Sequence, residues 1–206
     1  MTEITHVWSD LHALHQNIIH YTNRHEIWAT TEAMTWGLIN NFNSVVGPND
    51  HTLWLGDMFM GGVEKSMPLM KHFNGTHELI LGNHDKPFPV GHSGKPNSKA
   101  DYWMERYLEY FTEINIHKIM NLGGHKVEFI HFPPHGDSGD IERYQDFRPK
   151  DDGETIYVHG HVHDERVLFA DRCLHVGVDA DFTDWGIKRY HPIPFSVVEE
   201  IVSGNW

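Results

Sequence analysis

Residues 4–12 read Ile4-Thr5-His6-Val7-Trp8-Ser9-Asp10-Leu11-His12, an apolar stretch followed directly by a carboxylate and an imidazole. A short apolar stretch bounded by polar residues predicts a buried strand. Asp10 and His12 stand two positions apart, so extended backbone would place their side chains on one side. The stretch therefore predicts a strand whose carboxyl end presents two polar groups to a single small target.

The same arrangement, a probable strand followed by polar side chains, recurs four more times. Gly56-Asp57 follows the stretch His51–Leu55, and Gly82-Asn83-His84-Asp85 follows Glu78–Leu81. Later in the chain, His131 lies at the end of Lys126–Phe132, and Gly160-His161-Val162-His163 follows Thr155–Val158. In open α/β sheets, ligands bind at the carboxyl ends of strands. We therefore expect the five strand ends to converge, with the glycines allowing close approach of the backbone.

The remaining pattern predicts a layered α/β domain that spans residues 1–206. Further strands are expected at Ile116–Leu122, Arg166–Phe169 and Cys173–Val178, with Gly123-Gly124 as a hairpin turn. Helices are expected from the Thr30 cap to about Val45, at Val63–Phe73 and at Asp101–Tyr110. Because helices alternate with strands only in the first half, we expect a largely parallel sheet there and an antiparallel sheet in the second half.

Composition narrows the class of protein. The chain of 206 residues has one cysteine, Cys173, which excludes an intrachain disulfide and fits a reducing compartment. It starts without a secretory signal and has no apolar run of membrane-spanning length, so we expect a cytoplasmic protein without a membrane partner. A net charge of −13 argues against long nucleic acid as a partner. Nothing in the sequence indicates an oligomeric state.

The side chains at the strand ends point to metal. Each motif alone is ordinary, since Gly-Asp is usually a turn and a single histidine is usually a structural one. Together they supply two carboxylates, four histidines and one asparagine, more than one tetrahedral site uses. This nitrogen and oxygen set without thiolate suits Mn²⁺, Fe or Zn²⁺. The sequence therefore predicts a centre of two divalent ions that share a carboxylate.

The ordered motifs resemble the signature of calcineurin-like metallophosphoesterases: Asp-x-His, Gly-Asp, Gly-Asn-His-(Asp/Glu), His and Gly-His-x-His. The resemblance covers residues 10–163. The opening, Ser9-Asp10-Leu11-His12-Ala13-Leu14-His15-Gln16-Asn17-Ile18-Ile19, is similar to a small prokaryotic and phage-type phosphohydrolase subgroup, as are Asn43-Ser44-Val45-Val46 and Leu55-Gly56-Asp57. The closing His175-Val176-Gly177-Val178-Asp179 departs from that subgroup, which more often carries Asn at the position of His175.

The resemblance implies a four-layer α-β-β-α sandwich of two mixed sheets with two metal ions at its top. By the matching motif positions, the first ion would be held by Asp10, His12 and His163, the second by Asn83, His131 and His161, and both by Asp57. Manganese is the first choice, with iron, zinc or nickel as alternatives. His84 would protonate the leaving oxygen, Asp85 could orient His84, and His15 and Lys86 could contact substrate.

The function implied is that of a phosphodiesterase that cleaves a small or nucleotide-type phosphodiester with a metal-bridged hydroxide. A protein phosphatase is disfavoured, because Met58-Phe59-Met60 follows Gly-Asp where that branch carries Asp and Arg. Two alternatives stay open, a phosphomonoesterase and a catalytically silent scaffold with the same fold. The substrate is not named by the sequence.

Two loops are the candidates for setting specificity. One spans 86–99 and is locally basic, with Lys86, His92, Lys95 and Lys99. The other spans 133–153 and is long and polar. Long loops within a compact domain are often functional.

Overall fold

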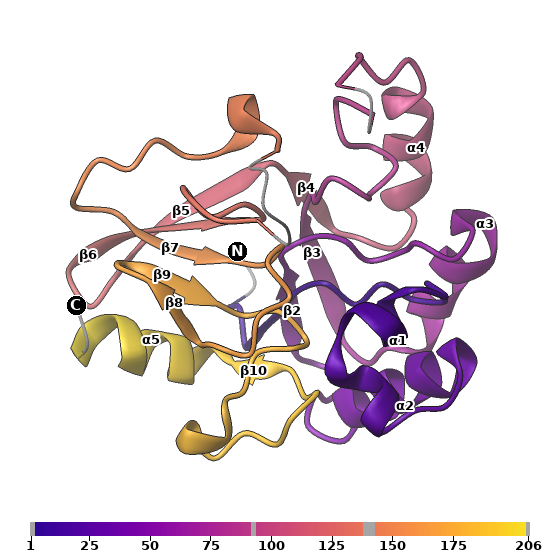
Figure 1. Ribbon diagram of the computed structural model, residues 1–206, viewed down its shortest axis with the longest axis horizontal. Coiled ribbons are helices and arrows are strands. Elements are labelled where there is room, and N and C mark those ends of the chain that lie inside the picture. The colour runs from indigo at the N-terminus through magenta and orange to yellow at the C-terminus, as the bar shows by residue number, and fades with distance from the viewer. Residues whose placement is uncertain (1–2, 92–93, 138–142, 205–206) are drawn as a thin grey trace.

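Two five-stranded sheets pack against each other, and helices flank them (Figure 1). The computed structural model describes residues 3–91, 94–137 and 143–204. His92 of the first loop lies outside the described residues. The α/β two-sheet sandwich expected from the sequence is confirmed.

The first sheet has the strand order β10-β1-β2-β3-β4. Its strands are β10 (Ile193–Pro194), β1 (His6–Trp8), β2 (His51–Trp54), β3 (Thr76–Ile80) and β4 (Glu113–Asn115). The strands β1 to β4 are parallel, and only β10 pairs antiparallel. The prediction of a largely parallel first sheet is therefore confirmed, and the carboxyl ends of β1, β2 and β3 meet at one edge.

The second sheet has the order β5-β6-β7-β9-β8 and corrects the sequence prediction. Its strands are β5 (His117–Leu122), β6 (His125–Ile130), β7 (Ile156–His159), β9 (Cys173–His175) and β8 (Leu168–Ala170). We expected an antiparallel sheet, yet β6 pairs parallel with β7, and β7 with β9. Only a tight hairpin forces antiparallel pairing, and the long 131–155 connection lets β7 run in the same direction as β6. Parallel pairing brings the ends of β6 and β7 to the same edge.

Helices cover the face of the first sheet that points away from the second (Figure 1). They are α1 (Ile18–Tyr21), α2 (Thr31–Asn43), α3 (Val63–Ser66) and α4 (Ala100–Tyr107), with short 3₁₀ helices η1 (Asn23–Glu26) and η2 (Met67–His72). The Thr30 hydroxyl caps α2 by accepting a hydrogen bond from the Ala33 N–H at 3.1 Å. The single helix expected over Val63–Phe73 is divided between α3 and η2, with Pro68 in the first turn of η2.

Sequence analysis missed β4, β10 and the C-terminal helix α5 (Phe195–Gly204), as well as the short 3₁₀ turns η3 (Gln145–Phe147) and η4 (Thr183–Trp185). The buried residues of α5 recur every three to four positions, the spacing of one helix face, so the sequence does contain the signal for this helix. They are Phe195, Val198, Ile201 and Val202. Strands of two or three residues, in contrast, leave too short a pattern to recognise.

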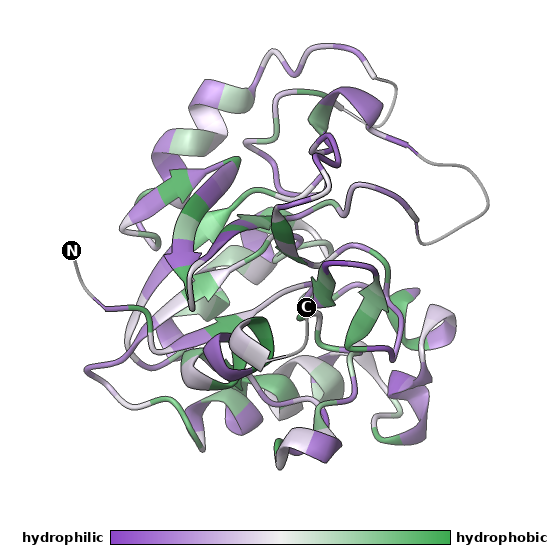
Figure 2. Ribbon diagram, turned by 90° about the vertical axis from the view of Figure 1, so that its left-hand side faces the viewer, coloured by the Kyte–Doolittle hydropathy of each residue, from purple (hydrophilic) through white to green (hydrophobic). Residues whose placement is uncertain are grey.

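The apolar interior forms two large clusters. One lies between the first sheet and its helices, where the ring of Phe42 stacks on Trp54 at 5.3 Å between centroids. The other holds residues of both sheets and of α5, including the stacked pair Phe129 and Phe195. Figure 2 shows hydrophobic residues concentrated along the strands, with hydrophilic residues prominent in the outer loops. Within the described ranges, none of the helices has the length and apolarity needed to cross a bilayer.

The first cluster predicts a large effect of shortening Phe42, whose exposed fraction is 0%. Phe42→Ala should lower the free energy of unfolding by about 3–5 kcal/mol, because it leaves a cavity among Trp8, Trp54 and Phe73. Trp36→Ala on the same helix is the control, since Trp36 is 43% exposed and should cost much less. Equal losses in urea denaturation would contradict this account of the core.

Candidate metal centre

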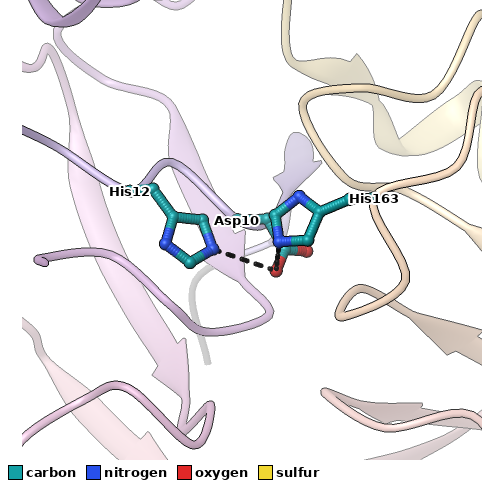
Figure 3. A group of neighbouring side chains, drawn as sticks. All are labelled: Asp10, His12 and His163. Carbon is teal, nitrogen blue, oxygen red and sulfur yellow. Dashed lines mark ion pairs between the residues drawn. The ribbon is translucent and has the colours of Figure 1, made fainter. Parts of the chain in front are cut away.

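Asp10, His12 and His163 form the first group of side chains that could hold an ion (Figure 3). The Nε2 atoms of His12 and His163 each lie 3.8 Å from Oδ1 of Asp10. Asp10 and His12 follow β1, whereas His163 follows β7, so the group joins the two sheets. These three residues are the ones that the resemblance implied for the first ion.

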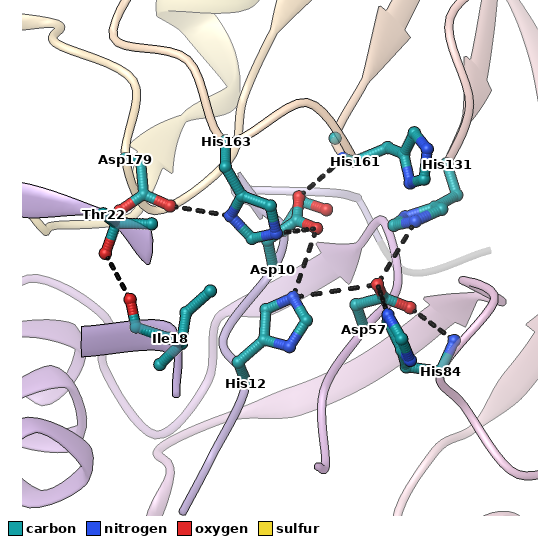
Figure 4. Close-up of polar contacts among 12 residues, drawn as sticks. Asp10, His12, Ile18, Thr22, Asp57, His84, His131, His161, His163 and Asp179 are labelled. Carbon is teal, nitrogen blue, oxygen red and sulfur yellow. Dashed lines mark hydrogen bonds and ion pairs between the residues drawn. The ribbon is translucent and has the colours of Figure 1, made fainter. Parts of the chain in front are cut away.

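Asp10, Asp57 and His131 form a second such group, next to the first (Figure 4). Nε2 of His131 lies 3.5 Å from Oδ2 of Asp57 and 3.3 Å from Oδ1 of Asn83. The structure thus brings Asn83, Asp57 and His131 together, as expected for a second ion. Asp10 is the carboxylate common to both groups.

The position of Asp57 is compatible with a bridge between two ions. Its Oδ2 lies 3.7 Å from Nε2 of His12 and 3.5 Å from Nε2 of His131. Its Oδ1 accepts a hydrogen bond from the backbone N–H of His84 at 2.8 Å. The number of ions and the choice of Asp57 as the shared ligand stay predictions.

Hydrogen bonds at Nδ1 leave the Nε2 atoms of two histidines available for a cation. His131 donates from Nδ1 to the carbonyl oxygen of Leu55 at 2.7 Å, and His163 donates from Nδ1 to Oδ2 of Asp179 at 2.9 Å. A metal-binding histidine commonly donates its other ring N–H to a carbonyl or carboxylate. Both rings therefore have the orientation that a metal ligand requires, with Nε2 free to bind once it carries no proton.

Sequence reasoning missed the group that holds Asp179. Arg24 is fully buried and donates from Nε and a terminal nitrogen to the two oxygens of Asp179, at 2.8 and 2.9 Å. It also donates to the backbone carbonyls of Asp10 at 2.8 Å and Leu11 at 3.1 Å. Asp179 closed the quoted terminal motif, but nothing in the sequence around Arg24 indicated that it would be buried there.

The ligand loops are held in uncommon backbone conformations. Nine non-glycine residues in the described ranges have positive φ, and five of them are the expected ligands Asp10, His12, Asp57, His161 and His163. Left-handed backbone costs an L-residue about 1–2 kcal/mol, which the surrounding structure has to offset. Concentrated strain of this kind is typical of a functional site.

Glycine is required where the loops approach each other. A Cβ atom at Gly82 would lie 2.2 Å from Oδ1 of Asp57, and one at Gly160 would lie 2.3 Å from Oδ2 of Asp10. Any side chain there would displace a ligand carboxylate. The prediction that these glycines permit close approach is confirmed.

The centre contains polar atoms that a cation would satisfy. Oδ1 of Asp10 and both ring nitrogens of His12 are buried without a hydrogen-bond partner among the described residues. A buried acceptor without a partner costs about 1–3 kcal/mol. A divalent ion beside Asp10 and His12 would satisfy such acceptors, so these residues fit the metal that the motifs imply.

Burial and opposite charge act against each other on the pKa values of the cluster. Burial alone would raise the pKa of Asp10 and Asp57, but the neighbouring histidines lower both well below the usual range. For His131, burial lowers the pKa, while Asp57 and Asp10 raise it to about 9. Burial dominates at His12 and lowers its pKa to about 4. Without metal, the centre therefore keeps its carboxylates ionised and one proton on His131.

His161 is placed differently from the other expected ligands. Its backbone N–H donates to Oδ2 of Asp10 at 2.9 Å, which fixes the loop after β7. Its Nε2 lies 3.1 Å from Oδ1 of Asp137, and its ring packs on that of His131 with centroids 5.1 Å apart. The two candidate groups within the described part of the chain do not include His161.

His84 and Asp85 follow Asn83 but face different surroundings. Nε2 of His84 lies 3.9 Å from Oδ2 of Asp57, and the side chain is 19% exposed. The carboxylate of Asp85 accepts hydrogen bonds from the backbone N–H groups of Asp57, Met58 and Gly82 at 2.9–3.0 Å. Asp85 therefore ties the loop after β2 to the loop after β3, and its proposed orienting of His84 stays a prediction.

A cavity of 540 Å³ opens beside the centre. Its lining residues are His12, His15, Asn17, Ile18, Tyr21, Met60, His84, Arg143 and His163. His15 thus lies where the sequence placed it, with its ring 5.5 Å from that of His12. Lys86 is exposed and is not among the described residues that line this cavity.

Comparisons with known proteins identify relatives of this chain by sequence and a solved structure with a similar fold. No protein-family model matches the chain. The gene 66 protein of Mycobacterium phage L5 is 33% identical over 187 residues, covering 86% of each chain. The gene 66 protein of Mycobacterium phage D29 is 30% identical over 210 residues, covering 97% of each. A solved protein of unknown function from Aquifex aeolicus has a TM-score of 0.64 at 24% identity, over 95% of this chain and 97% of that one, which supports the fold alone.

The bond between Asp179 and His163 predicts a selective loss of metal. Asp179→Asn should weaken binding at the first group about 10- to 100-fold, because an amide holds the His163 N–H less strongly than a carboxylate. Binding at the second group should stay as in the wild type, which calorimetric titration of Mn²⁺ would resolve. Asp181→Asn is the control, since within the described ranges the Asp181 carboxylate accepts hydrogen bonds from Thr183 and from none of the candidate ligands. Unchanged binding in Asp179→Asn would contradict the assignment.

The raised pKa of His131 predicts that metal binding releases a proton. At pH 7, below its pKa of about 9, His131 is protonated in the metal-free protein. A cation that takes Nε2 must displace this proton, so affinity should rise as pH increases from 7 towards 9. Titrations in buffers of different ionisation enthalpy should show about one more proton released at pH 7 than at pH 10. Equal release at both values would exclude a protonated His131.

Proposed function

The chain belongs to the family of the gene 66 proteins of mycobacteriophages L5 and D29, and we propose that it is a metal-dependent phosphodiesterase acting on small phosphodiesters. The observation that carries the proposal is the convergence of Asp10, His12, Asp57, His131 and His163 at one buried edge of both sheets. Two divalent ions bound there would lower the pKa of water and offset negative charge on phosphoryl oxygens.

The cavity supports a phosphate ester as the substrate. His84, His15 and Arg143 line it beside the candidate ligands, so side chains that can donate hydrogen bonds face the cavity in a protein of net charge −13. Arg143, whose side chain is 46% exposed, can donate to phosphoryl oxygens. Divalent ions bound at the adjoining centre would add the positive charge that attracts an anion to this cavity.

The apolar part of the same cavity favours a diester. Ile18, Tyr21 and Met60 line it, and Tyr21 is 72% exposed. A phosphate alone needs only the cationic part, whereas the second ester group of a diester can pack on these side chains. A phosphomonoesterase remains the alternative, because nothing in the cavity excludes a smaller substrate.

His84 is the proposed general acid. It lines the cavity, stays partly exposed, and lies beside Asp57 without belonging to either candidate metal group in the described chain. A group so placed can give a proton to the leaving oxygen. The hydrogen bond from the His84 backbone N–H to Oδ1 of Asp57 fixes the His84 backbone relative to the centre.

The activity is tested with protein loaded with Mn²⁺, by comparing bis(p-nitrophenyl) phosphate with p-nitrophenyl phosphate. A higher kcat/KM for the diester is expected. Faster cleavage of the monoester would favour the phosphatase, and no cleavage of any phosphate ester at full metal occupancy would favour the scaffold.

His84→Ala should retain its metal ions yet lose about 10²–10⁴ in kcat. The loss should be largest for diesters with poor leaving groups, because these need protonation most. Metal content by elemental analysis is the control for an intact centre. A variant with wild-type kcat on every substrate would remove His84 from this role.

A further inference from the structure

The 133–153 loop brings Arg143 to the cavity beside the metal centre. Arg143 lines this cavity together with the predicted ligands His12 and His163 and with His84. Its side chain is 46% exposed, so a molecule bound in the cavity can contact the guanidinium group. The proposed function uses Arg143 as a hydrogen-bond donor and leaves open what fixes its position.

Asp137 fixes Arg143 through both its side chain and its backbone. A terminal guanidinium nitrogen of Arg143 donates to Oδ1 of Asp137 at 2.6 Å, and the Arg143 backbone N–H donates to Oδ2 at 2.9 Å. The side chain of Asp137 is itself 0% exposed. Hydrogen bonds between ionised partners are roughly twice as strong as neutral ones. The buried carboxylate therefore holds the guanidinium group of Arg143 in one place at the cavity.

Arg148 holds Asp137 from the other side and balances its charge. Its side chain is 2% exposed and donates to Oδ2 of Asp137 at 2.8 Å. It also donates to the backbone carbonyls of Pro133, Gly136 and Arg143 at 2.8–2.9 Å. A buried carboxylate is stable only when it is paired in this way. Because two arginines share one carboxylate, the three side chains together keep a net positive charge, and Arg143 is the exposed member.

A contact that only fastened the loop would not need the second arginine. Arg148 already bonds Asp137 and three carbonyls of the loop, and it is buried. Arg143 adds a second guanidinium group on the side of the loop that lines the cavity. A guanidinium group is planar and matches the geometry of phosphate oxygens.

We propose that Arg143 and Asp137 form a phosphate clamp, in which Arg143 binds a non-bridging phosphoryl oxygen and Asp137 is the positioning residue that holds its guanidinium group. The inference rests on the proposed function, because the phosphoryl group is that of its substrate. It assigns the 133–153 loop a role in binding the phosphoryl group.

The first test measures the binding of inorganic phosphate to Mn²⁺-loaded protein by calorimetry, which requires no hydrolysis. Arg143→Ala should weaken phosphate binding about 10- to 100-fold, the effect of losing a hydrogen bond between charged groups. Arg172→Ala is the matched control. Arg172 pairs with Asp151 of the same loop and is not among the described residues that line the cavity. Wild-type phosphate affinity in Arg143→Ala at equal metal content would overturn the proposal.

The second test separates positioning from a purely structural role of Asp137 by a double-mutant cycle. Asp137→Asn should weaken phosphate binding about 10-fold in the wild-type background, because an amide holds the guanidinium group less strongly. In the Arg143→Ala background the same substitution should have little further effect, since Asp137 acts through Arg143. An equal loss in both backgrounds would overturn the positioning role.

Arg143→Lys keeps the proposal testable should Asp137→Asn fail to fold. Lysine retains the positive charge but lacks the planar fork that can bond Asp137 and a phosphoryl oxygen in one fixed geometry. This variant should also weaken phosphate binding, by about 10-fold. Wild-type affinity in Arg143→Lys would show that charge alone suffices, and the positioning role of Asp137 would be wrong.

The two proposals can fail separately. Phosphate binding that depends on Arg143 and Asp137, without hydrolysis of any phosphate ester, would sink the phosphodiesterase and leave the clamp standing. Hydrolysis with wild-type kcat/KM and wild-type phosphate affinity in Arg143→Ala would do the reverse.

Discussion

The structure depends on placing two ionised carboxylates, Asp10 and Asp57, out of contact with water. Their exposed fractions are 0% and 1%. Burying a charge costs several kcal/mol unless an opposite charge accompanies it. In the metal-free protein the surrounding histidines supply part of that compensation, and the unsatisfied atoms of Asp10 and His12 show that it is incomplete. A divalent cation is the simplest group that completes it.

The fold places these buried carboxylates beside the histidines by bringing the strand ends together. The strands β1, β2 and β3 of one sheet and β6 and β7 of the other end at the same edge, and each contributes at least one side chain. Arg24 then holds Asp179, the carboxylate that accepts the hydrogen bond from Nδ1 of His163. In the loop after β6, Arg148 holds Asp137, whose Oδ1 lies 3.1 Å from Nε2 of His161. In both halves of the centre, an arginine therefore fixes a carboxylate that lies beside an expected ligand histidine.

Much of this could be predicted from the sequence, because the strongest signals were local. A strand followed by Asp, Asn or His within a few residues is visible in one dimension, and the five strand ends met as expected. The supporting residues were not visible, because Arg24 and Asp179 meet across 155 positions of the chain. The direction of β7 was also predicted wrongly, since it depends on how the 131–155 connection crosses the sheet. Very short strands such as β10 carry no periodicity at all.

The central claim is that these side chains gather around two cations, and anomalous scattering from a crystal soaked in Mn²⁺ tests it most directly. The account predicts two peaks a few ångströms apart, one among Asp10, His12 and His163 and one beside Asn83 and His131, with the Asp57 carboxylate between them. A map with no peak at these residues, or with Asp10 and Asp57 directed away from the bound metal, would contradict it.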